Sequence, residues 1–181
     1  MEDSILSQGI HHVAFATRNS RATYEFYHNK LGMPLAHVES HRQEDGYFKH
    51  YFFDMGQDQY MGFFEISNVG EKPDFRTDIS TGLGLPPWVN HIAFNIGNRE
   101  RFEEIKLRLK TNKVKMMAEV DHEWCRSVYL LDPNKIMVEF TYTSDASKFS
   151  QTPEEAYDLL FNSDMESAGD ETRKDVVTRN P

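Results

Sequence analysis

The sequence predicts an α+β fold made of two tandem β-α-β-β-β modules. The first observation is a weak internal repeat, in which residues 12–19 (HVAFATRN) align with residues 91–98 (HIAFNIGN) and share a His, an Ala, a Phe and an Asn. An amphipathic helical pattern follows each copy, and three strand-like segments follow each helical pattern. We therefore expect one domain over residues 1–142, with modules at about 9–67 and 88–142 joined by a linker, 68–87.

Both predicted helices begin after residues that favour helix N-termini and end at turn-forming residues. Residues 21–31 follow Asn19 and Ser20 and stop at Gly32, while residues 99–110 follow Asn98. Each helix has an apolar stripe at helical spacing, which predicts one buried face. The stripes are Tyr24, Tyr27 and Leu31 in the first helix and Phe102, Ile105 and Leu109 in the second.

The predicted strands are short runs separated by Gly, Asp, Pro and Asn turns. They cover 34–39, 47–55 and 60–67 in the first half and 114–120, 125–131 and 136–142 in the second. Beyond them, residues 143–181 form a C-terminal extension with a helix over 153–162, where Thr152 and Glu155 make a capping box. The rest of this tail is polar, and we expect it to be disordered.

Composition and charge restrict the partners and the location that we expect. The 181 residues have a net charge of −9, which argues against nucleic acid and against an anionic membrane surface. No apolar run is long enough to span a bilayer, and the acidic start is unlike a signal peptide, so we expect a cytoplasmic protein. The single cysteine, Cys125, excludes an internal disulfide and a cysteine-only metal cage.

One histidine and one glutamate recur in each half. Because side chains alternate along a strand, His12 shares a face with Ala14 and Ala16, and His91 shares one with Ala93 and Asn95. This leaves space beside each imidazole. Glu65 and Glu139 lie within apolar runs near the end of each half, and either one alone is best explained by solvent exposure. Together, two imidazoles and two carboxylates favour a divalent metal site.

These residues resemble the metal ligands of the vicinal oxygen chelate superfamily, which includes glyoxalase I, extradiol dioxygenases, fosfomycin-resistance enzymes and bleomycin-binding proteins. The segment that carries this resemblance most specifically is 127–139, SVYLLDPNKIMVE. The resemblance covers about residues 9–142. It implies a half-open eight-stranded barrel around one divalent ion, with His12, Glu65, His91 and Glu139 as ligands and a small-molecule substrate that binds through two adjacent oxygens. Because members of this superfamily often form dimers, the resemblance also implies that this chain can form a homodimer.

The resemblance leaves three functions open. Tyr129 occupies the position of a tyrosine that hydrogen-bonds the substrate oxygen in extradiol dioxygenases. His122 is near, but not at, the position where those enzymes carry a further histidine. Both residues favour Fe(II) and ring cleavage. Glu65 as a fourth ligand or a base favours a glyoxalase-I-like lyase or isomerase with Ni, Zn, Mn or Co. The third function left open is that of a metal-free binding module of the bleomycin-resistance type. We expect Tyr129, His122 and Glu65 to be the catalytic residues, and we favour the dioxygenase.

Overall fold

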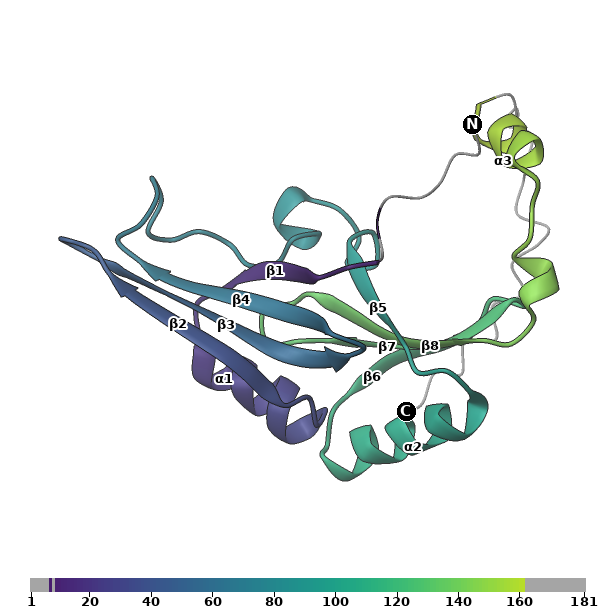
Figure 1. Ribbon diagram of the computed structural model, residues 1–181, viewed down its shortest axis with the longest axis horizontal. Helices are drawn as coiled ribbons and strands as arrows, with labels where there is room; N and C mark the ends of the chain where they lie inside the picture. Colours follow the sequence, from purple (N-terminus) through teal and green to yellow (C-terminus); the bar gives the residue numbers. More distant parts are fainter. Residues whose placement is uncertain (1–6, 8, 162–181) are drawn as a thin grey trace.

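The computed structural model describes residue 7 and residues 9–161, which form two four-stranded sheets (Figure 1). In the first sheet the strand order is β1-β4-β3-β2, and β1 pairs in parallel with β4. The second sheet repeats this arrangement as β5-β8-β7-β6, with β5 parallel to β8. The strands are β1 (His12–Thr17), β2 (Leu35–Arg42), β3 (Tyr47–Gly56), β4 (Gln59–Ser67), β5 (His91–Asn95), β6 (Met116–Asp121), β7 (Cys125–Leu131) and β8 (Met137–Thr143).

The predicted α+β class and the repeated β-α-β-β-β topology are confirmed. Each half has one helix after its first strand and three further strands. Among the described residues, no strand of one sheet pairs with a strand of the other, so the eight strands do not close into a barrel. The arrangement of the eight strands is consistent with a half-open barrel.

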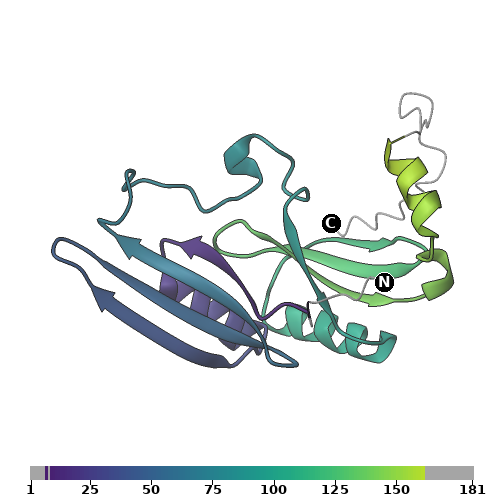
Figure 2. The same ribbon diagram turned by 45° about the horizontal axis from the view of Figure 1, so that its top comes forward.

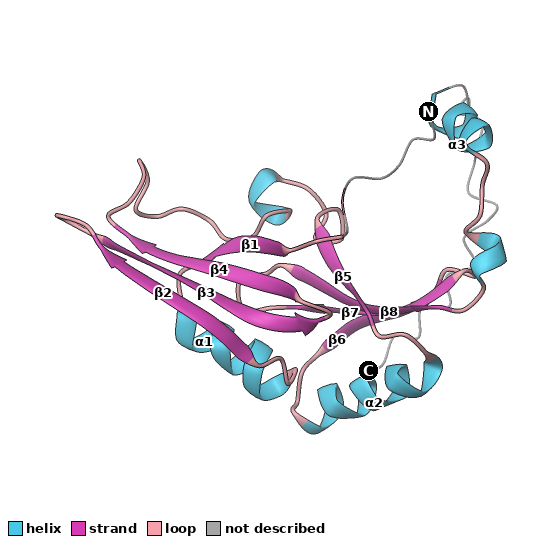
Figure 3. Ribbon diagram, viewed as in Figure 1, coloured by secondary structure: helices cyan, strands magenta, loops and turns pink. Residues whose placement is uncertain are grey.

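The helix that follows the first strand of each half lies on the same side of the sheets (Figure 3). The first combines α1 (Ser20–Tyr24) with a wider π-helical segment, η1 (Glu25–Lys30), and the second is α2 (Arg99–Thr111). The side chain of Asn19 accepts a hydrogen bond from the N–H of Ala22, and that of Asn98 accepts one from Arg101. Both helices therefore begin at the residues that the predicted N-caps indicate.

The core lies between each helix and its sheet. Its fully buried members come from both halves: Tyr27, Phe53, Met61 and Phe63 from the first, and Phe102, Leu109, Val128, Leu130, Ile136 and Val138 from the second. The opposite face of β1 and β5 stays accessible, because His12, Ala14, His91 and Ala93 are all exposed. The prediction that the two histidines share a face with small residues, away from the helices, is confirmed.

A buried polar contact joins the two halves. The turn between β7 and β8 places Asp132 where its carboxylate accepts a hydrogen bond from the hydroxyl of Tyr27, at 3.1 Å. The same carboxylate accepts hydrogen bonds from the N–H groups of Asn134 and Ile136, both at 2.8 Å. The turn is therefore folded around one acidic side chain and docked on the first helix.

The remaining segments lie outside the sheets. The linker contains a single 3₁₀ turn, η2 (Thr81–Leu83), and the chain after β8 forms η3 (Ala146–Lys148) and α3 (Pro153–Phe161). Figure 2 shows α3 standing away from both sheets. The helix expected over 153–162 is present to within one residue, and the expectation of a disordered tail lies outside the described residues. No helix in the described part of the chain has the length and apolar character to cross a bilayer.

Candidate functional site

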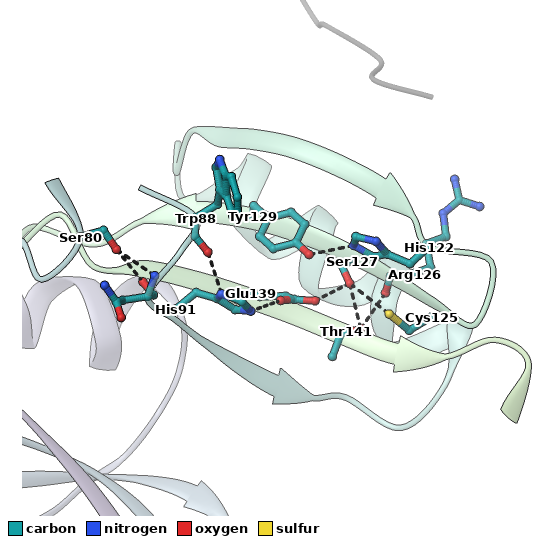
Figure 4. A network of polar contacts seen from close by, with 11 residues as sticks. Ser80, Trp88, His91, His122, Cys125, Arg126, Ser127, Tyr129, Glu139 and Thr141 are labelled. Atoms are coloured by element: carbon teal, nitrogen blue, oxygen red, sulfur yellow. Dashed lines mark hydrogen bonds and ion pairs between the residues drawn. The ribbon is translucent and has the colours of Figure 1, made fainter. Parts of the chain in front are cut away.

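His91 and Glu139 meet on the exposed face of the second sheet. The Nε2 atom of His91 is 3.2 Å from Oε2 of Glu139, and its Nδ1 atom is 2.9 Å from the carbonyl oxygen of Trp88 (Figure 4). Because a carbonyl can only accept, Nδ1 must carry the hydrogen. In a neutral imidazole Nε2 then presents a lone pair to a carboxylate oxygen. Two acceptors at this distance need a proton or a cation between them, so the pair is either an ion pair of protonated His91 with Glu139 or two ligands of one cation.

Neighbouring hydroxyls hold the Glu139 carboxylate. Its side chain is only 6% exposed, and its second oxygen, Oε1, accepts a hydrogen bond from the hydroxyl of Ser127. Thr141 lies 2.9 Å from the same hydroxyl and donates to the carbonyl of Arg126. This network fixes the carboxylate and leaves Oε2 directed at His91.

Tyr129 and His122 form a second pair beside the first. Tyr129 lies opposite Glu139 in the β7–β8 register, and its hydroxyl is 2.9 Å from Nε2 of His122. Burial, with the charge of Glu139 next in importance, raises the pKa of Tyr129 well above its ordinary value. Tyr129 therefore stays a neutral hydroxyl at physiological pH and can donate a hydrogen bond.

The structure places His12 in the other sheet, apart from this cluster. Its Nδ1 atom is 2.8 Å from Nδ1 of His11, and its ring packs edge-on against Phe52 and His50, with centroid distances of 5.6 and 6.3 Å. All these partners belong to the first half. Within one copy of the described chain, therefore, His91 and Glu139 come together and His12 does not join them.

Glu65 is not the structural counterpart of Glu139, so the equivalence predicted from the repeat is wrong. In the second sheet Ala93 pairs with Glu139, whereas in the first sheet the corresponding Ala14 pairs with Gly62. Glu65 lies three residues further along β4, and an odd step along a strand reverses the face. Its side chain therefore points to the helix side of the sheet.

On that side, Glu65 anchors the start of α1. Its carboxylate accepts hydrogen bonds from the N–H of Ser20 at 3.0 Å, from the hydroxyl of Tyr47 at 3.0 Å and from Nζ of Lys49 at 3.1 Å. Burial opposes the charge of Glu65, but these hydrogen bonds outweigh it and lower the pKa to about 2. These contacts make Glu65 a structural residue in this conformation.

The sequence reasoning missed two residues of the site, Ser127 and Cys125. Ser127 holds Glu139, and the thiol of Cys125 lies 3.7 Å from the Ser127 hydroxyl. The signal that could have found them is the two-residue period, because residues 125, 127 and 129 share one face of β7. Among the described residues, the only group of at least three potential ligand residues whose atoms lie within 4.8 Å is His122, Cys125 and Glu139.

The fold defines a class of proteins with two β-α-β-β-β modules, and the comparisons name the family. The profile of the Glyoxalase/Bleomycin resistance protein/Dioxygenase superfamily matches residues 9–140. The chain therefore belongs to this superfamily, as the vicinal oxygen chelate resemblance implied. No curated protein is matched by the sequence.

Solved structures share the fold at low sequence identity. A mutant of the fosfomycin resistance protein FosX from Listeria monocytogenes, in complex with Mn(II) and a dihydroxypropylphosphonic acid, has a TM-score of 0.55 and 21% identity and covers 80% of this chain and 100% of its own. A glyoxalase/dioxygenase from Nostoc punctiforme has a TM-score of 0.54 and 18% identity, with coverages of 79% and 99%. A lactoylglutathione lyase from Agrobacterium tumefaciens has a TM-score of 0.51 and 16% identity, with coverages of 75% and 94%.

Proposed function

We propose that this protein is an enzyme that depends on a divalent metal held by His12, His91 and Glu139. The observation that supports it is the His91–Glu139 pair, in which Nε2 of the imidazole lies 3.2 Å from a carboxylate oxygen. The donor set of two imidazoles and one carboxylate suits Fe(II), Mn, Co, Ni or Zn. A metal-free binding module would hold the same two side chains together only through a proton on His91.

His12 reaches this pair, in our proposal, from a second copy of the chain. His12 is exposed on the helix-free face of the first sheet, and its contacts in the described chain stay within that sheet. Because α1 and α2 lie on the same side (Figure 1), the helix-free faces of one copy do not oppose each other. A homodimer in which the first sheet of one copy faces the second sheet of the other brings the three ligands together.

Among the reactions of this superfamily, we favour extradiol-type ring cleavage with Fe(II). Bound at such a site, Fe(II) supplies chelation of two adjacent substrate oxygens and reaction with dioxygen. Three protein ligands leave room for both, whereas a fourth would not. The bonds of Glu65 to Ser20, Tyr47 and Lys49 keep it on the other face of β4, which removes the observation that favoured a glyoxalase-I-like lyase or isomerase.

Tyr129 and His122 are suited to orient the substrate and move its proton. Tyr129 is a neutral hydroxyl beside Glu139, so it can donate a hydrogen bond to a substrate oxygen. His122 lies 2.9 Å from that hydroxyl and is exposed, so it can exchange a proton with solvent. Both groups come from the second half, next to the proposed metal position. Such a soluble small-molecule enzyme fits a cytoplasmic location.

The test is metal analysis followed by turnover. The protein, purified without chelator, is expected to bind about one divalent ion per chain. Loaded with Mn(II), an ion that thiolate ligands do not favour, His91→Ala is expected to lose this ion, and Glu65→Gln, the matched control for a carboxylate on the other face, is expected to keep it. After anaerobic loading with Fe(II), we expect oxygen uptake with a catechol. Absence of metal affinity would contradict any metal enzyme, and isomerisation of a thiohemiacetal without oxygen uptake would contradict the dioxygenase.

A further inference from the structure

Glu139 has a second set of potential metal ligands on the side away from His91. A ring nitrogen of His122, the thiol of Cys125 and a carboxylate oxygen of Glu139 all lie within 4.8 Å of one another. In Figure 4 the carboxylate lies between His91 on one side and the His122 and Cys125 side chains on the other. The cluster thus combines a nitrogen, a sulfur and an oxygen donor.

The local fold explains why His122 and Cys125 approach each other. The N–H of His122 donates to the carbonyl oxygen of Cys125 at 2.9 Å, which closes the turn between β6 and β7. Within this turn Glu123 has a φ of 70°, a left-handed conformation that reverses the chain. The turn folds the imidazole of His122 back over the start of β7. Cys125 is 2% exposed, and its thiol lies 3.7 Å from the hydroxyl of Ser127, on the side of the cluster.

The geometry requires only a small contraction to bind an ion. Zinc ligands lie about 2.0–2.3 Å from the metal, which puts tetrahedral donors roughly 3.3–3.8 Å apart. The side chain of His122 is exposed and belongs to a turn, so it can move by the remaining distance. It would have to leave the hydroxyl of Tyr129, 2.9 Å away, if Nε2 is the ligating atom.

We propose that His122, Cys125 and Glu139 bind a thiophilic divalent cation such as zinc or cadmium. The sulfur–metal bond forms as the S–H bond breaks, and the proton passes to the solvent. This donor set needs neither His12 nor His91, so it stands independently of the proposed catalytic metal. Both sites use Glu139, and its two oxygens face opposite sides, with Oε2 toward His91 and Oε1 toward Ser127.

Cobalt absorption spectroscopy tests this directly, with Co(II) as a substitute for zinc. Cys125 is the only cysteine of the chain, so a thiolate-to-cobalt charge-transfer band in the near ultraviolet can come only from this residue. We expect the full-length protein, kept reduced with a phosphine, to show this band on titration. Cys125→Ala is expected to abolish it and His122→Ala to weaken it. His91→Ala, which removes the proposed catalytic ligand, is expected to retain it.

Each outcome bears on the proposal. A full-length protein without the band overturns it, and so does a band that persists in Cys125→Ala. Loss of the band in His91→Ala would assign the thiolate to the His91 site and overturn the separate donor set. Since Cys125→Ala changes a buried residue, X-ray absorption on the zinc-loaded unmodified protein gives a second measurement. One sulfur at about 2.3 Å from zinc is expected, and a shell with only nitrogen and oxygen contradicts the site.

Discussion

At the residue scale, hydrogen bonds to one imidazole decide what the site can bind. The carbonyl of Trp88 fixes the hydrogen of His91 on Nδ1, and Ser127 occupies Oε1 of Glu139. The facing atoms, Nε2 and Oε2, are then both acceptors unless His91 is protonated. In the metal site that we propose, these backbone and hydroxyl groups orient the pair toward the cation, as outer hydrogen bonds do at known metal sites.

This arrangement predicts an unusual effect of Glu139→Gln. The new amide can donate to Nε2 of His91 and still accept from Ser127, so it satisfies both neighbours without a metal. We expect the metal-free variant to match the unmodified protein in unfolding free energy to within about 1 kcal/mol. Its metal affinity should fall by more than the roughly 10- to 100-fold typical of outer partners. Denaturation in chelator and metal titration measure the two effects, and a metal affinity that is unchanged would remove Glu139 as a ligand.

Glu65 predicts an acid-dependent loss of stability. Its pKa is lowered from 4.5 to about 2 in the folded protein, so the folded state favours the ionised form. The stabilisation is complete above about pH 4.5 and is lost as the pH falls through about 2. With solvent screening of this partly accessible group, we expect it to be of order 1–2 kcal/mol.

Denaturation of Glu65→Gln at several pH values checks this assignment. The variant should be less stable than the unmodified protein at pH 7, and the difference should shrink between pH 4.5 and 2. Lys49→Met removes one of the partners of Glu65 and should reproduce part of the loss. A stability difference that does not depend on pH would show that the carboxylate charge contributes nothing.

At the element scale, the turn between β7 and β8 joins the two halves. Asp132 is 5% exposed and accepts from the N–H groups of its own turn, from the amide of Asn134 and from the hydroxyl of Tyr27 in the first helix. The side-chain amide of Asn134 also donates a hydrogen bond to the hydroxyl of Thr23. Burial raises the pKa of Asp132, although these hydrogen bonds oppose the shift. A single turn of the second half is thus hydrogen-bonded to two residues of the first helix.

Removal of this carboxylate should destabilise the whole fold. Asp132→Ala leaves several buried donors without an acceptor, and we expect it to lower the unfolding free energy by roughly 3 kcal/mol. Tyr27→Phe removes one hydrogen bond and leaves Asp132 with its other partners, so a loss of about 1 kcal/mol is expected. Chemical denaturation of both variants and of the double mutant gives the coupling energy. Additive losses would contradict a direct contact between the halves.

At the scale of the whole molecule, the two sheets do not close on each other within the described chain. His12 lies on the first sheet, and His91 and Glu139 lie on the second. If two copies pair so that each site takes His12 from one copy and the other ligands from its partner, defects in the two sheets can complement each other. In a symmetric dimer every site then has the same composition.

Mixing two inactive variants tests this arrangement. His12→Ala and Glu139→Gln should each bind Mn(II) poorly, but their heterodimer has one site in which all ligands are intact. After random exchange of subunits we expect about a quarter of the unmodified Mn(II) content to return. His91→Ala mixed with Glu139→Gln is the matched control, because both defects lie in the same sheet and no intact site can form. No recovery in the first mixture would place the three ligands in one chain.

The sequence by itself determined the secondary structure and the faces of the first strands. Two-residue and 3.6-residue periods are local properties, so the β-α-β-β-β repeat, the helix starts at Asn19 and Asn98, and the exposed histidines on β1 and β5 could be predicted. The resemblance to a known superfamily was also available from the sequence, because the segment 127–139 keeps the spacing of its motif.

Only the tertiary structure decided which carboxylate lies beside which histidine. The pairing register places Gly62, rather than Glu65, opposite Ala14, while Glu139 lies opposite Ala93. Register depends on contacts between segments that are distant along the chain, and an odd shift reverses the face of every side chain. For the same reason the sequence could not place Ser127 under Glu139 or His122 over Cys125, since a turn and a neighbouring strand determine both positions.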